Sequence, residues 1–360
     1  MSCLLETAGH PDSENAALIG VHAGGERPAT IRDVASHAGV SHQTVARFLK
    51  GDTSIKKPAR ERIKLAIEQL DYRTNRSAQS LKTGKTNTVG LFILEIDDPG
   101  PARTVKGAIH AARNAGYVLD TIALDTGDAE EIESVLESIR HQGLDAILSL
   151  DYTDQMAQAL READLPIPLM MSNAVAGLGD ELASDAPAAG VPFVVQHLAE
   201  LGHERLLHVA GPHTWPAARR RSRAFEQAVE DRGLVSAGIV NGDWTARSGF
   251  DAINSLGPEL DFTAVVAAND RMALGVIRAL TLRGLRVPDD MSVTGIDDMP
   301  DAEFTSPPLT TLRVDFEQAG HDSFLSLLAT MKGEPSPVIP LVPAPLVVRE
   351  STGPRPAAQK

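Results

Sequence analysis

The sequence contains a single cysteine, Cys3, among 360 residues. One cysteine excludes an intrachain disulfide and a zinc site built from cysteines, and this composition fits a reducing cytoplasm. No apolar run reaches the roughly 18 residues that a membrane span needs, and the first residues lack the basic and apolar regions of a secretory signal. We therefore expect a cytoplasmic protein without a membrane span.

Motifs of the common catalytic and metal-binding classes are also missing. The sequence has no HExxH zinc motif, no GxSxG nucleophile turn, no GxxxxGK[ST] phosphate loop and no GxGxxG after a strand. Its 11 histidines are scattered, and no carboxylate is paired with an activated nucleophile. We expect neither catalysis nor a bound metal or cofactor.

What is present is an uneven distribution of charge. The formal net charge is −14, yet residues 29–85 hold 12 basic and 5 acidic residues, which leaves 22 basic and 43 acidic residues elsewhere. A basic module on an acidic body suggests a polyanionic partner for the module alone. Chance clustering on a solvated surface explains the charge equally well, so the spacing of residues has to decide.

Between residues 29 and 73, apolar residues recur at helical spacing in three short segments, which predicts three amphipathic helices around one small core. Thr30 is expected to cap the first helix and Ser41 the second, with Gly39 in the tight turn between them. The polar side chains that the second helix presents suit base edges and phosphates, and they are His42, Gln43, Thr44 and Arg47. This pattern indicates a DNA-binding helix-turn-helix; the alternative is a small bundle with a polar face.

From residue 88 onward, strands alternate with helices, which predicts two lobes of parallel sheet covered on both faces. We expect buried strands at residues 88–94, 117–124, 145–150, 167–172, 205–211, 237–244, 263–270 and 292–297. Amphipathic helices are expected between them, for example at 102–114, 217–232 and 271–283. Two lone strands, 310–316 and 345–350, are expected to cross between the lobes and form a hinge.

These patterns divide the chain into five parts. We expect a disordered leader at 1–28, a helix-turn-helix domain at 29–73, a hinge helix and linker at 74–86, a two-lobed body at 87–350 and a flexible tail at 351–360. The first lobe covers about 87–187 plus 312–337, and the second about 188–311 plus 338–350. The polar hinge segment is marginal as an isolated helix, so it should fold only when something supports it.

The order of motifs resembles the lactose-repressor (LacI/GalR) family of bacterial transcription regulators, and several motifs lie close to its type member. The resemblance spans roughly residues 30–350 and is carried by TIRDVASHAGVSHQTVARFLKG, NRSAQSLKTGK, AGPHTWPAARRRSRAF, NGDWTARSGFDA, TAVVAANDRMALGVIRAL and SVTGIDDMPDAEFTSPPLTTLRVDF. It implies a helix-turn-helix headpiece on a body similar to periplasmic binding proteins.

The resemblance also implies roles in DNA binding. It places His42, Gln43 and Arg47 at base-reading positions. It assigns phosphate contacts to Ser41 and Thr44 and includes Thr30 among the DNA-binding residues. It also implies a hinge helix that enters the minor groove, formed by Asn75, Arg76, Ala78, Gln79 and Leu81, with Leu81 as the wedge. The sequence departs from the type member at His42 (Tyr there) and Ala46 (Ser there), and Thr74 replaces the usual Pro, so the operator sequence cannot be carried over.

For a small sugar ligand, the resemblance implies contacts from Arg221, Asn269, Asp297, Trp244, Asn173, Phe316, Leu94 and Asp98. Taken singly, Asn269 and Asp297 suit helix N-caps, Arg221 a surface ion pair and Trp244 a core position. Asn173 stands where the type member has Asp, and Asp98 where it has an apolar residue, which leaves the exact sugar open.

The sequence therefore predicts a cytoplasmic, nucleoid-associated, homodimeric repressor of sugar-utilisation genes that a galactoside-like inducer releases from operator DNA. A corepressor-type regulator remains the alternative. A transport-type sugar-binding protein would need an export signal and no helix-turn-helix, and a sugar kinase would need phosphate-binding loops. No heptad pattern follows residue 350, so we expect a dimer rather than a tetramer.

Overall fold

The computed structural model describes residues 27, 29–49, 51–72, 84–94, 99–124, 128–140, 142–172 and 185–356. It divides into two compact units, Met1–Gly84 and Lys85–Lys360, which are considered separately. The predictions for the leader 1–28 (apart from residue 27), for Asn75, Arg76, Ala78, Gln79 and Leu81 of the hinge helix, and for Asp98 and Asn173 lie outside the described residues.

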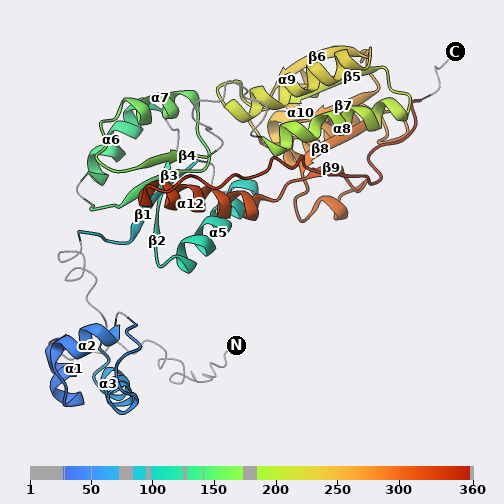
Figure 1. Ribbon diagram of the computed structural model, residues 1–360. Coiled ribbons are helices and arrows are strands. Elements are labelled where there is room, and N and C mark those ends of the chain that lie inside the picture. The colour runs from blue at the N-terminus through green and yellow to red at the C-terminus, as the bar shows by residue number, and fades with distance from the viewer. Residues whose placement is uncertain are drawn as a thin grey trace, which may run out of the picture. The chain divides into compact units, whose positions relative to one another are not determined.

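The described residues of the first unit form the helices α1 (Ile31–Ala38), α2 (His42–Leu49) and α3 (Lys57–Gln69) (Figure 1). Thr30 forms a capping box with Asp33 at the start of α1, and Gly39 ends α1 with a φ of 61°, which favours glycine. Ser41 Oγ accepts a hydrogen bond from the Thr44 amide at 3.2 Å. The predicted caps are therefore confirmed, and they fix the turn between α1 and α2.

The first lobe of the second unit is a parallel sheet in the order β2-β1-β3-β4. One face packs on α5 and α12, and the other on α6 and α7. The bounds are β1 (Thr88–Leu94), α5 (Pro99–Asn114), β2 (Val118–Leu124), α6 (Ala129–Ile139), β3 (Ala146–Ser149), α7 (Asp154–Glu162), β4 (Leu169–Met171) and α12 (Phe316–Lys332). Side chains of β1 alternate between the two cores, so the near-continuous apolar strand is buried on both sides.

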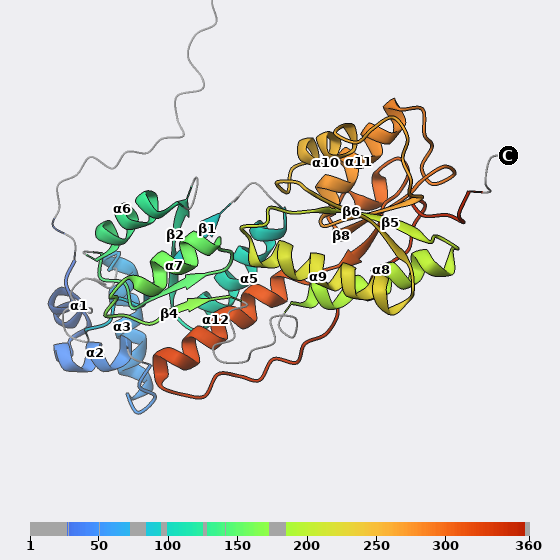
Figure 2. The same ribbon diagram turned by 90° about the horizontal axis from the view of Figure 1, so that it is seen from above.

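The second lobe holds a larger sheet in the order β10-β9-β8-β7-β5-β6, which is parallel except for β10. Helices α8 and α9 cover one face and α10 and α11 the other (Figure 2). The bounds are α8 (Ala186–Glu200), β5 (Arg205–Ala210), α9 (Pro216–Asp231), β6 (Val235–Asn241), α10 (Ala246–Asn254), β7 (Ala264–Ala267), α11 (Asp270–Leu282), β8 (Ser292–Asp297), η1 (Ala302–Phe304), β9 (Thr310–Arg313) and β10 (Leu346–Val347). The predicted two-lobed α/β body is confirmed.

Two expectations near the C-terminus are wrong. The strands expected to stand alone, β9 and β10, pair with each other and extend the second sheet, because β9 also hydrogen-bonds β8 in parallel register. The residues expected to form a flexible tail are held on the second lobe as far as residue 356. Ser351 is buried and donates to the Val293 carbonyl, and the Arg355 amide donates to the Leu201 carbonyl.

The return of the chain to the first lobe depends on close packing between α5 and α12, which lie side by side in both views (Figures 1 and 2). Gly107 of α5 lies against the Glu317 carbonyl, and Gly320 of α12 against the Thr104 carbonyl. A Cβ atom at either glycine would collide with backbone, so only glycine allows these helices to approach so closely. Lys106 and Glu317 add an ion pair at 2.7 Å across the same contact.

Candidate DNA-reading surface and effector pocket

The polar face of α2 is held by a small core beneath it. Val45 is fully buried between the three helices, while Ser41, His42, Gln43 and Arg47 are exposed. A short helix with one apolar face buried and a row of hydrogen-bonding side chains in solvent suits the major groove of DNA. The residues expected to read bases therefore share one open surface.

The hydroxyls of Thr30, Ser41 and Thr44, expected at the DNA interface, also make hydrogen bonds within the first unit. Thr30 Oγ1 donates to the Asp33 carboxylate at 2.7 Å, and Ser41 Oγ lies 2.9 Å from Thr44 Oγ1. Hydrogen bonding to Thr30 lowers the pKa of Asp33. These hydroxyls are positioned before any phosphate arrives, because each has an intramolecular partner at a helix start.

In the second lobe, polar side chains converge beyond the carboxyl ends of the parallel strands, where ligands of such sheets bind. Arg221 of α9 lies with a nitrogen 4.0 Å from Asp297 Oδ1, and its guanidinium lies 5.3 Å from the centre of the Trp244 ring. Arg221 also donates to the Ala268 carbonyl at the end of β7. The structure thus brings together three of the residues expected in the pocket.

Asn269 does structural work in the same place. Its Oδ1 accepts the Met272 amide at 2.8 Å and caps α11, and its Nδ2 donates to the Trp244 carbonyl at 2.9 Å. The amide still has one N–H and one lone pair for a ligand. Asn269 is therefore an N-cap that also fixes the backbone of Trp244, which has a φ of 72°.

Trp244 is a core residue as much as a candidate stacking platform. Only 7% of it is exposed, and its ring lies on Gly211, where a Cβ would collide with it. Trp215 meets it edge-on with ring centres 6.0 Å apart. Trp215 packs against the core of the first lobe as well as that of the second, so it joins the two lobes beside the pocket.

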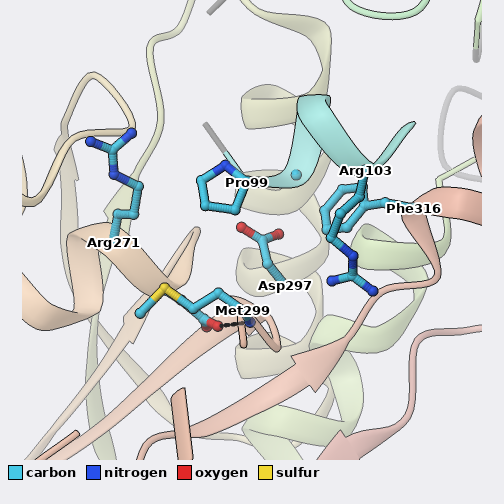
Figure 3. Close-up of a pocket in the computed structure, with 8 residues that line it drawn as sticks. Pro99, Arg103, Arg271, Asp297, Met299 and Phe316 are labelled. Atoms are coloured by element: carbon cyan, nitrogen blue, oxygen red, sulfur yellow. Dashed lines mark hydrogen bonds between the residues drawn. The ribbon is translucent and has the colours of Figure 1, made fainter. Parts of the chain in front are cut away.

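A small cavity lies where the two lobes meet (Figure 3). It is lined from the first lobe by Pro99, Gly100, Arg103 and Phe316, and from the second by Asp270, Arg271, Asp297 and Met299. The Asp297 carboxylate points toward Pro99, and the Arg103 guanidinium lies 5.5 Å from the centre of the Phe316 ring. The accessible volume is only about 10 Å³, room for about one water, so a larger ligand would fit only if the lobes moved apart.

The sequence-based site is incomplete in both directions. Leu94 belongs to the core between the first sheet and α6 and α7, and it does not line this cavity. Trp215 and Arg103 were missed. Trp215 follows the glycine at the end of β5, a signal that was available; Arg103 is one helical arginine among many, and only the packing of α5 on α12 directs it to the cleft.

Two buried titratable groups flank the pocket. Burial raises the pKa of Asp270 to about 7, even though the carboxylate accepts hydrogen bonds from Thr311 and the Met299 amide. Burial lowers the pKa of His208 to about 4. His208 Nδ1 must carry the proton, because it lies 2.8 Å from the Val266 carbonyl, which can only accept.

A bidentate ion pair links the lobes at the cleft. Arg219 of α9 contacts the two carboxylate oxygens of Asp154 of α7 at 2.7 and 2.8 Å. The Asp154 amide also donates to the Thr214 carbonyl at 3.0 Å. These contacts hold the lobes in the arrangement seen here.

In the described part of the chain, no helix combines the length and the apolar composition that a membrane span requires.

Two family models match the chain. Residues 30–75 match bacterial regulatory proteins of the lacI family, and residues 195–352 match the periplasmic binding protein-like domain. The chain is 30% identical to the lactose operon repressor of Escherichia coli K12 over 328 residues, 91% of each chain. It is 32% identical to the ribose operon repressor of that strain over 297 residues, 81% of this chain and 90% of that one.

Solved structures give the same result. The structure of the lac repressor dimer bound to operator and the anti-inducer ONPF covers 91% of this chain with 29% identity and a TM-score of 0.79. The complex of the transcriptional regulator CelR with cellobiose covers 90% with 30% identity and a TM-score of 0.66. Coverage of this extent, from the helix-turn-helix through both lobes, shows that the chain belongs to the lacI family of bacterial regulatory proteins and is a DNA-binding transcription regulator rather than an enzyme.

Proposed function

We propose that the protein is a homodimeric repressor that leaves its operator when a small sugar enters the cleft between the lobes. It would act in the cytoplasm, on the nucleoid. Support comes from relatives that repress the lactose and ribose operons and from a similar regulator bound to cellobiose. Two subunits place two α2 helices on a near-palindromic site, as helix-turn-helix dimers do.

The observation that supports sugar binding is the set of buried polar groups at the strand ends of the second lobe. Among the described residues, Arg221 Nε and Trp244 Nε1 are buried donors without a hydrogen-bond partner in the protein. Leaving such donors unsatisfied costs free energy, and sugar hydroxyls accept from N–H groups and donate to a carboxylate such as Asp297. The Trp244 ring offers an apolar face to the C–H groups of a sugar ring.

Release from DNA follows from the position of the cleft. A sugar larger than the present cavity has to move the first lobe relative to the second, and β1 of that lobe begins directly after the linker to the first unit. A ligand that prefers one arrangement of the lobes shifts the population toward it. Residues 75–81 would transmit this shift by losing the helix that they form on DNA, in which Leu81 is the wedge. Leu81→Ala should then weaken operator binding far more than sugar binding.

The test is a pair of titrations with the full chain. A gel shift on the DNA upstream of the gene identifies the operator, and a panel of galactosides and glucosides identifies the sugar that releases it. Arg221→Ala should reduce sugar affinity in calorimetry by at least about a hundredfold, because a buried charged donor is lost, and leave operator affinity unchanged. Arg223→Ala, on the exposed face of the same helix, is the matched control. Unchanged sugar affinity in Arg221→Ala would overturn the pocket.

The same experiment decides the sign of regulation. An inducer lowers the fraction of bound operator as its concentration rises, whereas a corepressor raises it. We propose induction, in which the sugar favours an arrangement of the lobes that binds the operator less tightly.

A further inference from the structure

The turn after α2 brings an acidic residue, Asp52, next to Arg47, the side chain expected to contact a base. After α2, Gly51 takes a left-handed φ of 79°, and its amide donates to the Phe48 carbonyl at 2.9 Å. The Asp52 amide donates back to the Arg47 carbonyl at 3.1 Å. This pair of bonds is the glycine-terminated turn that ends many helices, and it places Asp52 directly beside Arg47.

The side chains of this turn then fix the guanidinium. Arg47 Nε donates to Asp52 Oδ2 at 2.7 Å, and Arg47 Nη2 donates to Ser54 Oγ at 2.7 Å. Asp52 Oδ1 in turn accepts the Ser54 amide at 2.8 Å. Hydrogen bonds from Ser54 and then from Arg47 lower the pKa of Asp52 to about 2, so the carboxylate is charged at neutral pH.

The pattern of donors decides what this cluster does. A guanidinium carries five N–H groups in one plane; the contacts with Asp52 and Ser54 use the edge formed by Nε and Nη2. Among the described residues, Arg47 Nη1 has no hydrogen-bond partner, which leaves the N–H groups of Nη1 and the second N–H of Nη2 for other acceptors. Two parallel N–H groups at these nitrogens match the O6 and N7 acceptors of guanine.

We propose that Asp52 and Ser54 are specificity-determining residues that hold Arg47 with the end of its guanidinium toward a guanine in the major groove. The ion pair limits the rotamers of this exposed arginine and keeps its guanidinium from binding phosphates instead. Discrimination therefore rises, because a preordered donor pair loses less conformational entropy on the right base. This inference rests on the proposed base-reading role of α2.

The test begins with the wild-type full chain and a randomised duplex library at one fixed salt concentration, since affinities for DNA depend strongly on salt. Selected sequences define the preferred site, and Arg47→Ala identifies the base pair that Arg47 reads as the position where preference is lost. Asp52→Asn should reduce guanine preference at that same position by about tenfold and leave other positions unchanged. If the asparagine of this variant keeps the hydrogen bond from the Ser54 backbone N–H, its NH₂ group faces Arg47 Nε. Two donors then meet, and the hydrogen bond from Arg47 Nε is lost.

The matched control is Glu61→Gln, an exposed residue of α3 that loses the same charge without touching Arg47. It should strengthen binding to all sequences by one common factor. Ser54→Ala, which changes no charge, should reduce guanine preference by about threefold, because one of the two holding contacts is lost. Circular dichroism of each variant establishes that the three helices remain folded.

The outcomes separate cleanly. Equal, uniform strengthening by Asp52→Asn and Glu61→Gln would show that Asp52 contributes only charge and would overturn the proposal. Sharper guanine preference in Asp52→Asn would overturn it too, because Asp52 would then compete with the base. If wild type selects no sequence, or Arg47→Ala leaves the selected site unchanged, the base-reading role itself fails; loss of preference in Arg47→Ala with none in Asp52→Asn rejects the inference alone.

Discussion

The proposed reading face of α2 and the proposed pocket of the second lobe place their side chains in opposite surroundings. Gln43 and Arg47 stand in solvent above a core to which they contribute nothing. Arg221, Trp244 and Asn269 are buried, and each also satisfies backbone groups or fills the core. If these side chains have the proposed roles, recognition of DNA can change without cost to folding, whereas recognition of the effector is tied to the stability of the second lobe.

The strongest way to break this comparison is Trp244→Ala. Removing a ring that packs on Gly211 and Trp215 should lower the free energy of unfolding of the second lobe by about 3–5 kcal/mol, together with loss of effector binding. Urea unfolding followed by far-UV circular dichroism measures the first effect, and calorimetry the second. Full stability with lost binding would mean that the pocket is as independent of the core as α2.

The next largest effect is the loss of stability of the second lobe at acid pH. Because the pKa of His208 falls from 6.5 to about 4 on folding, the unfolded chain binds an extra proton between these values, and stability is lost as pH falls from 6.5 toward 4. The full effect is about 3 kcal/mol. Asp270, with its pKa raised from 3.8 to about 7, acts in the opposite sense over nearly the same range. The comparison must therefore be made between wild type and His208→Asn.

In that comparison, His208→Asn can keep the hydrogen bond to the Val266 carbonyl and removes the titrating ring. Its destabilisation relative to wild type should be largest near pH 7 and shrink as pH falls to 4. Urea midpoints at closely spaced pH values measure the trend. A constant difference across this range would show that the ring does not titrate on unfolding.

Gln43→Ala sharpens the comparison from the other side. Loss of an exposed glutamine that reads a base pair should reduce discrimination at one operator position by about 1–3 kcal/mol. The thermal midpoint of the first unit should not change. Competition binding at fixed salt and a melting curve of the same preparation give both values. A lowered midpoint would show that the reading face also carries stability.

The smallest expected effect is that of Arg219→Ala at the junction of the lobes. Its ion pair with Asp154 is partly exposed, with 33% and 54% of the two side chains accessible, so it contributes at most about 1 kcal/mol. Since the pair opposes separation of the lobes, its loss should lower the effector concentration for half-release of operator by about two- to fivefold. Asp154→Asn should act in the same direction; an increase would mean that the sugar closes the cleft rather than opening it.

How much of this was predictable depends on the range over which each feature is determined. Residues 88–94 form a strand with the bounds that the sequence predicts, because an apolar run with turn signals around it is a local property. The caps at Thr30 and Ser41 were equally accessible, since each involves residues three apart. The pairing of β9 with β10 was not, because it joins residues more than thirty positions apart.

In the site, the residue types were visible in the sequence and their surroundings were not. The strand ends at Asn269 and Asp297 were visible in the sequence, but only packing shows that Asn269 holds Trp244 in place. Leu94 was placed in the pocket, yet the register of β1 turns it with Phe92 toward α6 and α7. A strand alternates its faces strictly, so the side on which a terminal residue lies is a tertiary property.

The sequence by itself determined the three helices, the alternation of strands and helices and the family, because periodicity, caps and motif order are written in neighbouring residues. Tertiary structure alone decided which distant side chains meet, as Arg219 meets Asp154 across the cleft. Hydrogen bonds and ion pairs act over about 3 Å, and only the folded chain brings distant residues within that distance.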